Sequence, residues 1–110
     1  MKISDKERIK KIVLTWDALK HEIEIHNITK ESLLNDEFLQ WAVTTPLYNI
    51  GEHVYMLSAE FKNANNGIPW NVVSGLRHRL FHDYDGINWS IIVEVIFGEM
   101  DDFVNKIKNL

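Results

Sequence analysis

Apolar positions recur every three or four residues in the first part of the chain, which is the spacing of one helix face. Ser4 and Glu7 precede this stripe with the spacing of an N-terminal capping box. The stripe predicts a first helix from about Ser4 to His26, and its members are Ile9, Ile12, Val13, Trp16, Leu19 and Ile23. The run from Asn27 to Lys30 should end this helix, and a short turn of helix is expected from about Glu31 to Leu34.

A second helical stripe follows Asp36, which can cap a long segment running to about Asn63. Pro46 lies inside the segment and must kink or interrupt the helix, because proline lacks a backbone N–H and clashes with the preceding turn. Gly51 weakens the same region. The run from Asn63 to Gly67 predicts a loop. The stripe is clearest late, at Val43, Leu47, Ile50, Val54, Leu57 and Phe61.

Two further helices are predicted in the last third of the chain. Pro69 is well placed as the first residue of a third helix reaching about His82 or Tyr84. Asp85-Gly86 predicts a turn, and Asn88 should cap a fourth helix. The stripe of that helix is Trp89, Ile92, Val93, Ile96, Met100, Phe103 and Ile107. Strand signals are weak throughout. The sequence therefore predicts an all-α, up-and-down bundle of four main helices with a short extra helix, in one domain over residues 1–110.

Composition narrows the classes of protein to consider. The 110 residues are 45% hydrophobic and 25% charged, which is typical of a folded domain. The chain has no cysteine, which excludes thiolate chemistry and fits a reducing, cytoplasmic location. We expect neither a secretory signal nor a membrane-spanning segment. The net charge of −4 means that any nucleic-acid site must be locally basic. Two basic clusters exist: Lys6, Arg8, Lys10 and Lys11, which fit a solvated helix face, and Arg77, His78 and Arg79.

Arg77 is the anomaly of the third predicted helix. At about 100° per residue it falls inside the apolar arc that also contains Trp70, Val73, Phe81 and Tyr84. A guanidinium in an apolar stripe is costly unless it is paired or faces a functional site. Two interpretations follow: a buried or interfacial ion pair, with Glu52 as one candidate partner, or an arginine that faces a functional cleft.

His78 and His82 are four residues apart and therefore neighbours on a helix. They could be plain surface histidines, or hold two positions of a zinc site whose third ligand would be Asp83, Asp85, His21, His26 or His53. A third interpretation is metal-free chemistry on RNA. In this chemistry His82 takes a proton from a 2′-hydroxyl and Arg77 stabilises charge on the phosphate. On an ideal helix Arg77 and His82 diverge by about 140°, so a distorted helix end or a second subunit would have to bring them together.

The segment Gly75–Tyr84 contains an Arg-x4-His-x-Tyr pattern and resembles the hallmark of the HepT-like branch of the HEPN superfamily. In that branch an Arg precedes a His by four to six positions and a Tyr follows two residues later. The similarity extends over the whole chain. It includes Ile68-Pro69-Trp70, Ile50-Gly51-Glu52 and the Gly86-Ile87-Asn88 turn into the last helix.

The resemblance implies a homodimer in which two Arg/His pairs line a shared cleft, and a metal-independent endoribonuclease that acts as a toxin without a cofactor. It implies Arg77 and His82 as catalytic residues, with His78 and Glu52 in support. His78 departs from the asparagine usual at its position. The implied partner is a minimal nucleotidyltransferase antitoxin, which can transfer AMP onto Tyr84. The alternative is a non-catalytic HEPN module that binds a nucleotidyltransferase or a nucleotide.

Overall fold

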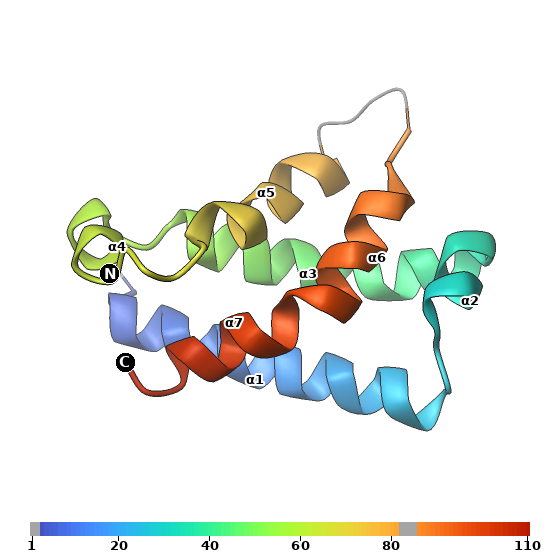
Figure 1. Cartoon of the computed structure of the whole chain (residues 1–110), viewed down its shortest axis with the longest axis horizontal. Helices are drawn as coiled ribbons and strands as arrows, with labels where there is room; N and C mark the ends of the chain where they lie inside the picture. The colour runs from blue at the N-terminus through green and yellow to red at the C-terminus, as the bar shows by residue number, and fades with distance from the viewer. Residues whose placement is uncertain (1–2, 82–85) are drawn as a thin grey trace.

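The computed structural model describes residues 3–81 and 86–110, and within them it is all helical. The seven helices of these two ranges are α1 (Asp5–Ile25), α2 (Lys30–Asn35), α3 (Glu37–Tyr55), α4 (Ala59–Ala64), α5 (Trp70–Phe81), α6 (Trp89–Gly98) and α7 (Met100–Ile107). The main segments α1, α3, α5 and the α6–α7 pair alternate in direction (Figure 1). The predicted all-α, up-and-down bundle is confirmed.

Local capping explains where the early helices begin. The Ser4 hydroxyl accepts a hydrogen bond from the Glu7 N–H at 3.1 Å and donates to the Glu7 carboxylate at 3.3 Å. Thr29 and Ser32 form a reciprocal capping box at the start of α2. This helix is the short extra helix expected near residues 31–34. The Asp36 carboxylate caps α3 by accepting from the Leu39 N–H at 3.2 Å, as predicted.

Of the two outcomes predicted at Pro46, a kink or an interruption, the interruption is wrong, because α3 runs through this residue from Glu37 to Tyr55. Proline leaves the carbonyl four residues earlier, that of Ala42, without its helical donor. Ala42 is exposed, so water can satisfy that carbonyl. The buried residues Val43 and Leu47 on either side pack into the core and hold the helix in place.

The long segment predicted to reach Asn63 instead ends at Tyr55, and α4 starts afresh after Ser58. The cause is a tertiary contact. The Asp5 carboxylate of α1 accepts from the Ser58 N–H at 2.9 Å and from its hydroxyl at 2.7 Å. The Ser58 hydroxyl in turn accepts from the Phe61 N–H and caps α4. Lys62 donates to the carbonyls of Val54 and Tyr55 at the end of α3.

The last third of the chain also differs from its prediction. The fourth helix divides at Glu99 into α6 and α7, next to Gly98, a residue with poor helix propensity. Asn88 occupies the N-cap position of α6 but makes no side-chain cap hydrogen bond. Its carbonyl accepts from the N–H groups of Ile91 and Ile92. The helix predicted from Pro69 begins one residue later, at Trp70.

A single apolar core lies between the helices and is built from the predicted stripes. Phe103 is 1% exposed and forms a T-shaped contact with Trp70, with ring centroids 5.8 Å apart. The two polar N–H groups of the core indoles find acceptors, Trp16 on Asp101 and Trp70 on the carbonyls of Lys62 and Asn65. In the two described ranges, no helix is both long enough and apolar enough to cross a membrane.

Candidate functional site

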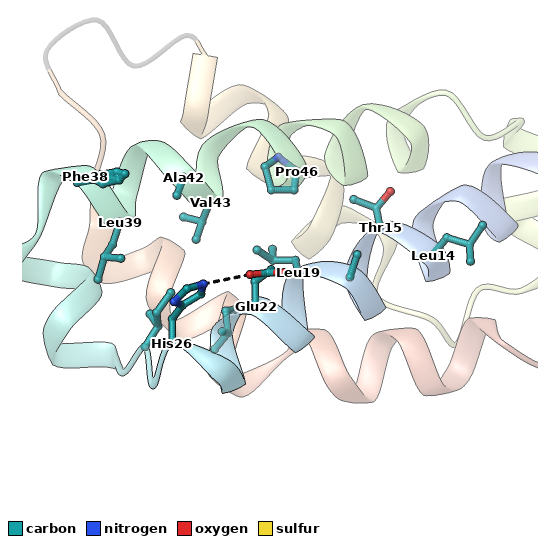
Figure 2. Close-up of a pocket in the computed structure, with 13 residues that line it drawn as sticks. Leu14, Thr15, Leu19, Glu22, His26, Phe38, Leu39, Ala42, Val43 and Pro46 are labelled. Carbon is teal, nitrogen blue, oxygen red and sulfur yellow. Dashed lines mark hydrogen bonds and ion pairs between the residues drawn. The ribbon is translucent and has the colours of Figure 1, made fainter.

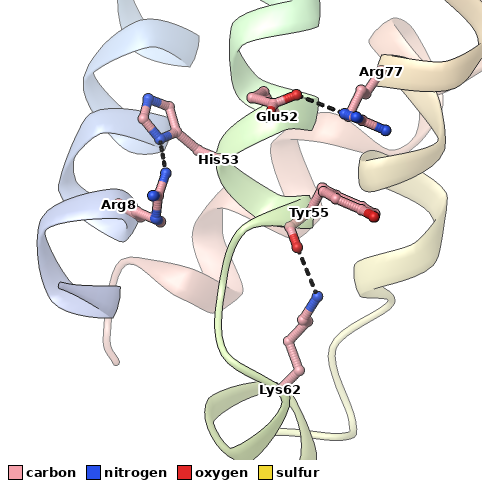
Figure 3. A network of polar contacts seen from close by, with 6 residues as sticks. All are labelled: Arg8, Glu52, His53, Tyr55, Lys62 and Arg77. Carbon is pink, nitrogen blue, oxygen red and sulfur yellow. Dashed lines mark hydrogen bonds and ion pairs between the residues drawn. The ribbon is translucent and has the colours of Figure 1, made fainter. Parts of the chain in front are cut away.

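Arg77 lies on α5 opposite Glu52 of α3, and the two side chains form an ion pair (Figure 3). Arg77 Nε donates to Glu52 Oε2 at 2.6 Å. The side chains are 27% and 34% exposed, so the pair lies at the edge of the core and remains accessible to solvent. The ion pair considered from the sequence is therefore present, and it accounts for the charge inside the apolar stripe.

Gly51 explains how these two helices come close enough for that pair. A Cβ placed at Gly51 would lie 2.8 Å from the backbone nitrogen of Arg77. A side chain of any size at this position would therefore push α5 away from α3. The Ile-Gly-Glu sequence is thus explained by two contacts. Gly51 allows the backbone of Arg77 to approach α3, and Glu52 supplies the carboxylate that binds Arg77.

Tyr55 is the third member of the site and was missed in the sequence analysis. The Arg77 Cζ lies 4.2 Å from the centroid of its ring, within cation–π distance. Tyr55 is three residues after Glu52, so both lie on the same face of α3. That spacing was the available signal. Glu52, Tyr55 and Arg77 are hereafter called the Arg77 site.

The chemistry of the Arg77 site favours a fixed cation. The hydrogen bond to Glu52 raises the pKa of Arg77, partly opposed by burial, so the guanidinium stays charged. Glu52 binds Nε, whereas four of the five N–H donors of a guanidinium lie on its two terminal nitrogens. Glu52 and Tyr55 therefore orient a donor group whose planar fork is suited to phosphate oxygens.

A second polar pair lies on the neighbouring side of α3. Arg8 Nη1 lies 3.1 Å from His53 Nδ1 (Figure 3). Burial lowers the pKa of His53, and the charges of Arg8 and Lys11 lower it further. His53 is thus held in the neutral form, accepting a hydrogen bond from Arg8. The basic cluster expected to be a solvated face therefore includes one residue with a structural partner.

The structure places the other predicted residues only in part. His78 lies on the exposed side of α5, one position after Arg77. His82, Tyr84 and Asp85 of the predicted turn lie outside the described ranges, as does the end predicted for the third helix at His82 or Tyr84. The approach of His82 to Arg77 and the placement of Tyr84 therefore stay predictions.

The zinc interpretation finds no support in the described ranges. There, no three side chains of His, Cys, Asp or Glu are grouped so that they could hold a metal ion. His82, Asp83 and Asp85, which that interpretation also invoked, are outside these ranges.

A separate apolar pocket of about 730 Å³ lies between α1 and α3 (Figure 2). Its lining includes Leu19, Phe38 and Pro46, and the Glu22–His26 pair lies on its edge at 3.1 Å. None of the residues of the Arg77 site lines it. Its apolar walls are not suited to bind a phosphate.

The all-helical bundle, with Arg77 paired to Glu52 across α3 and α5, is consistent with a HEPN-type protein. The comparison with family models agrees: the family described as "Ribonuclease HepT-like" matches residues 6–110. The chain therefore belongs to the HepT-like ribonuclease family.

Curated relatives support this membership along most of the chain. A protein of Caldanaerobacter subterraneus subsp. tengcongensis named "Putative RNase TTE0752" is 33% identical over 86 residues, covering 78% of this chain and 77% of that protein. "Putative RNase MJ0127" of Methanocaldococcus jannaschii is 32% identical, covering 86% and 82%. "Probable ribonuclease HepT" of Thermococcus cleftensis is 26% identical over the whole of this chain and 98% of its own. No solved structure matches the chain.

Proposed function

We propose that this protein is a metal-independent endoribonuclease toxin whose catalytic residues are Arg77 and His82. The observation that carries the proposal is the Arg77 site, in which Glu52 and Tyr55 orient a permanently charged guanidinium at the edge of the core. Family membership and the names of the relatives support ribonuclease activity.

In the proposed reaction, His82 takes the proton of a ribose 2′-hydroxyl, and the 2′-oxygen attacks the adjacent phosphorus. The bond from phosphorus to the 5′-oxygen breaks, and the leaving oxygen takes a proton from water, while protonated His82 returns its proton to solvent. The products are a 2′,3′-cyclic phosphate and a 5′-hydroxyl. Arg77 stabilises the charge that develops on the phosphate oxygens, and His78 supports binding from the next position on α5.

We also propose that the active form is a homodimer. The support is the angular separation of about 140° between Arg77 and His82 on an ideal helix, which a second copy across a shared cleft would overcome. Light scattering of the purified protein measures this directly, and a monomer that cleaves RNA at full rate would contradict it.

The proposed regulator is a minimal nucleotidyltransferase antitoxin that transfers AMP onto Tyr84. The added phosphate would pair with Arg77 or block the entry of RNA. Intact-mass measurement after co-expression with the neighbouring gene tests this proposal. If the toxin is silenced but its mass is unchanged, the antitoxin acts by covering the site and not by modifying Tyr84.

The test of catalysis is cleavage of RNA by the purified protein in excess chelator. Arg77→Ala and His82→Ala should each abolish cleavage and growth arrest. Lys10→Ala, which removes an exposed cation from the α1 cluster expected to be a solvated helix face, is the control and should remain active. Thermal melts of all variants show that each is folded. Full cleavage by both Arg77→Ala and His82→Ala would overturn the proposal.

A second candidate function is a non-catalytic module that binds a nucleotidyltransferase or a nucleotide. The net charge of −4 favours it, because a general RNA-binding surface is normally basic. A stable complex with the nucleotidyltransferase, combined with no cleavage of RNA by the free protein at any concentration, would establish this alternative.

A further inference from the structure

Tyr55 combines two properties that need a common explanation. Its ring contacts the guanidinium of Arg77, yet the residue is 53% exposed at the last position of α3. In Figure 3 the side chain extends from α3 toward α5 beside Arg77, and does not turn back to the core. An aromatic ring left this open costs hydrophobic stabilisation, and its contact with Arg77 uses only part of its surface.

The surroundings of Arg77 are aromatic on both sides along the contact between α3 and α5. Tyr55 lies toward the start of α5, whereas Phe81 is its last residue and packs against Tyr48 in a tilted arrangement, with ring centroids 4.9 Å apart. Phe81 is 64% exposed. An arginine flanked by accessible aromatic rings is the arrangement that binds single-stranded nucleic acid, with phosphate on the cation and bases on the rings.

We propose that Tyr55 is a substrate-binding residue that stacks on a base of single-stranded RNA next to the phosphate held by Arg77. The base is the one on the side of that phosphate that faces the start of α5, because Tyr55 lies on that side of Arg77. The inference rests on the proposed ribonuclease function and specifies its substrate class. A base inside a duplex is stacked on its neighbours and cannot reach the ring.

The alternative role of Tyr55 is to position Arg77 only. The two roles differ in their dependence on the base. Loss of positioning slows cleavage of every substrate equally, whereas loss of stacking removes the advantage of a substrate that carries the base. Combining a Tyr55 variant with removal of the base, and comparing the double change with each single change, therefore distinguishes the two roles.

The experiment uses a short labelled RNA whose cleavage position is first mapped with the wild-type protein. Each nucleotide flanking that position is then replaced in turn by an abasic one, and kcat/KM is measured. We expect a loss of roughly tenfold for wild type at one flanking position. The kcat/KM of Tyr55→Leu on the intact RNA should be lower than that of the wild type by a similar factor. It should not fall further when the nucleotide at that position is abasic. Tyr55→Phe keeps the ring and should keep the wild-type ratio of intact to abasic cleavage.

Phe97→Leu is the control, because it removes a partly exposed ring of α6 that lies outside the Arg77 site. Phe97→Leu should leave kcat/KM unchanged on both the intact and the abasic RNA. An equal effect of Tyr55→Leu on intact and abasic RNA would overturn the inference, as would equal cleavage of the single strand and its annealed duplex. Binding of the same RNAs to His82→Ala, measured by fluorescence anisotropy, reports stacking without cleavage. Failure of the proposed catalysis is then distinguishable from failure of this inference.

Discussion

Replacing Gly51 with alanine tests the contact on which the Arg77 site depends. The new Cβ would lie 2.8 Å from the Arg77 nitrogen, 3.2 Å from its Cβ and 3.3 Å from its Cα. Cβ atoms essentially never approach other atoms within 3.0 Å, and here the nearest atom is backbone rather than the end of a flexible side chain. Helix α5 must therefore shift away from α3.

Two opposing effects set the size of the change in the free energy of unfolding. Overpacking of a close contact costs about 1–3 kcal/mol. Replacing glycine by alanine inside a helix gains about 0.5–1 kcal/mol, because the unfolded chain has fewer conformations to lose. The net expectation is a destabilisation of about 0–2.5 kcal/mol. The shift should also lengthen the 2.6 Å contact between Arg77 and Glu52 and lower the rate of RNA cleavage.

Gly75 offers a matched control within α5. A Cβ at this position meets no atom within 4 Å, so Gly75→Ala should stabilise the fold by about 0.5–1 kcal/mol. Urea denaturation of the two variants measures the difference, which should be about 1–3 kcal/mol. Equal changes in the two variants would refute the close approach of α3 and α5 at Gly51.

Two further predictions concern the core and the pH dependence of stability. Phe103→Ala should lower the free energy of unfolding by about 3–5 kcal/mol. Phe38→Ala, at a residue that is 65% exposed, should change this free energy by less than about 0.5 kcal/mol. Similar urea midpoints for the two variants would contradict the assigned core. The lowered pKa of His53 favours its neutral form in the fold, so its contribution to stability is complete above the ordinary pKa of about 6.5 and is lost as pH falls below it. Thermal melts should therefore show that His53→Gln loses less stability than the wild type between neutral and acidic pH. The same pH dependence of stability in both proteins would contradict the lowered pKa of His53.

Much of the helical architecture could be read from the sequence, because it follows from spacing and local caps. The predicted stripe of α1 contains Ile12 and Trp16, and both are buried. Ser4 and Asp36 cap their helices through residues three positions away, so the signal and the structure lie in the same short segment. The position of Arg77 in an apolar arc was likewise visible from helical spacing.

The divisions of the helices could not be read in the same way. Helix α3 ends at Tyr55 and α4 begins after Ser58, because Asp5, 53 residues earlier in the chain than Ser58, binds Ser58. The helix persists through Pro46 because the lost hydrogen bond falls on its exposed side, a fact that depends on how α3 packs. Local propensity competes with tertiary contacts at such positions, and the tertiary contacts decide.

The sequence by itself therefore determined an all-α bundle, the apolar faces of its helices, and an arginine that required a partner or a ligand. Only the tertiary structure decided which partner it has. Glu52 lies 25 residues from Arg77 along the chain, and Gly51 lets the two helices approach closely enough for the pair to form. Tyr55 joins the site for the same reason: packing two helices brings together side chains whose proximity no spacing within a single helix specifies.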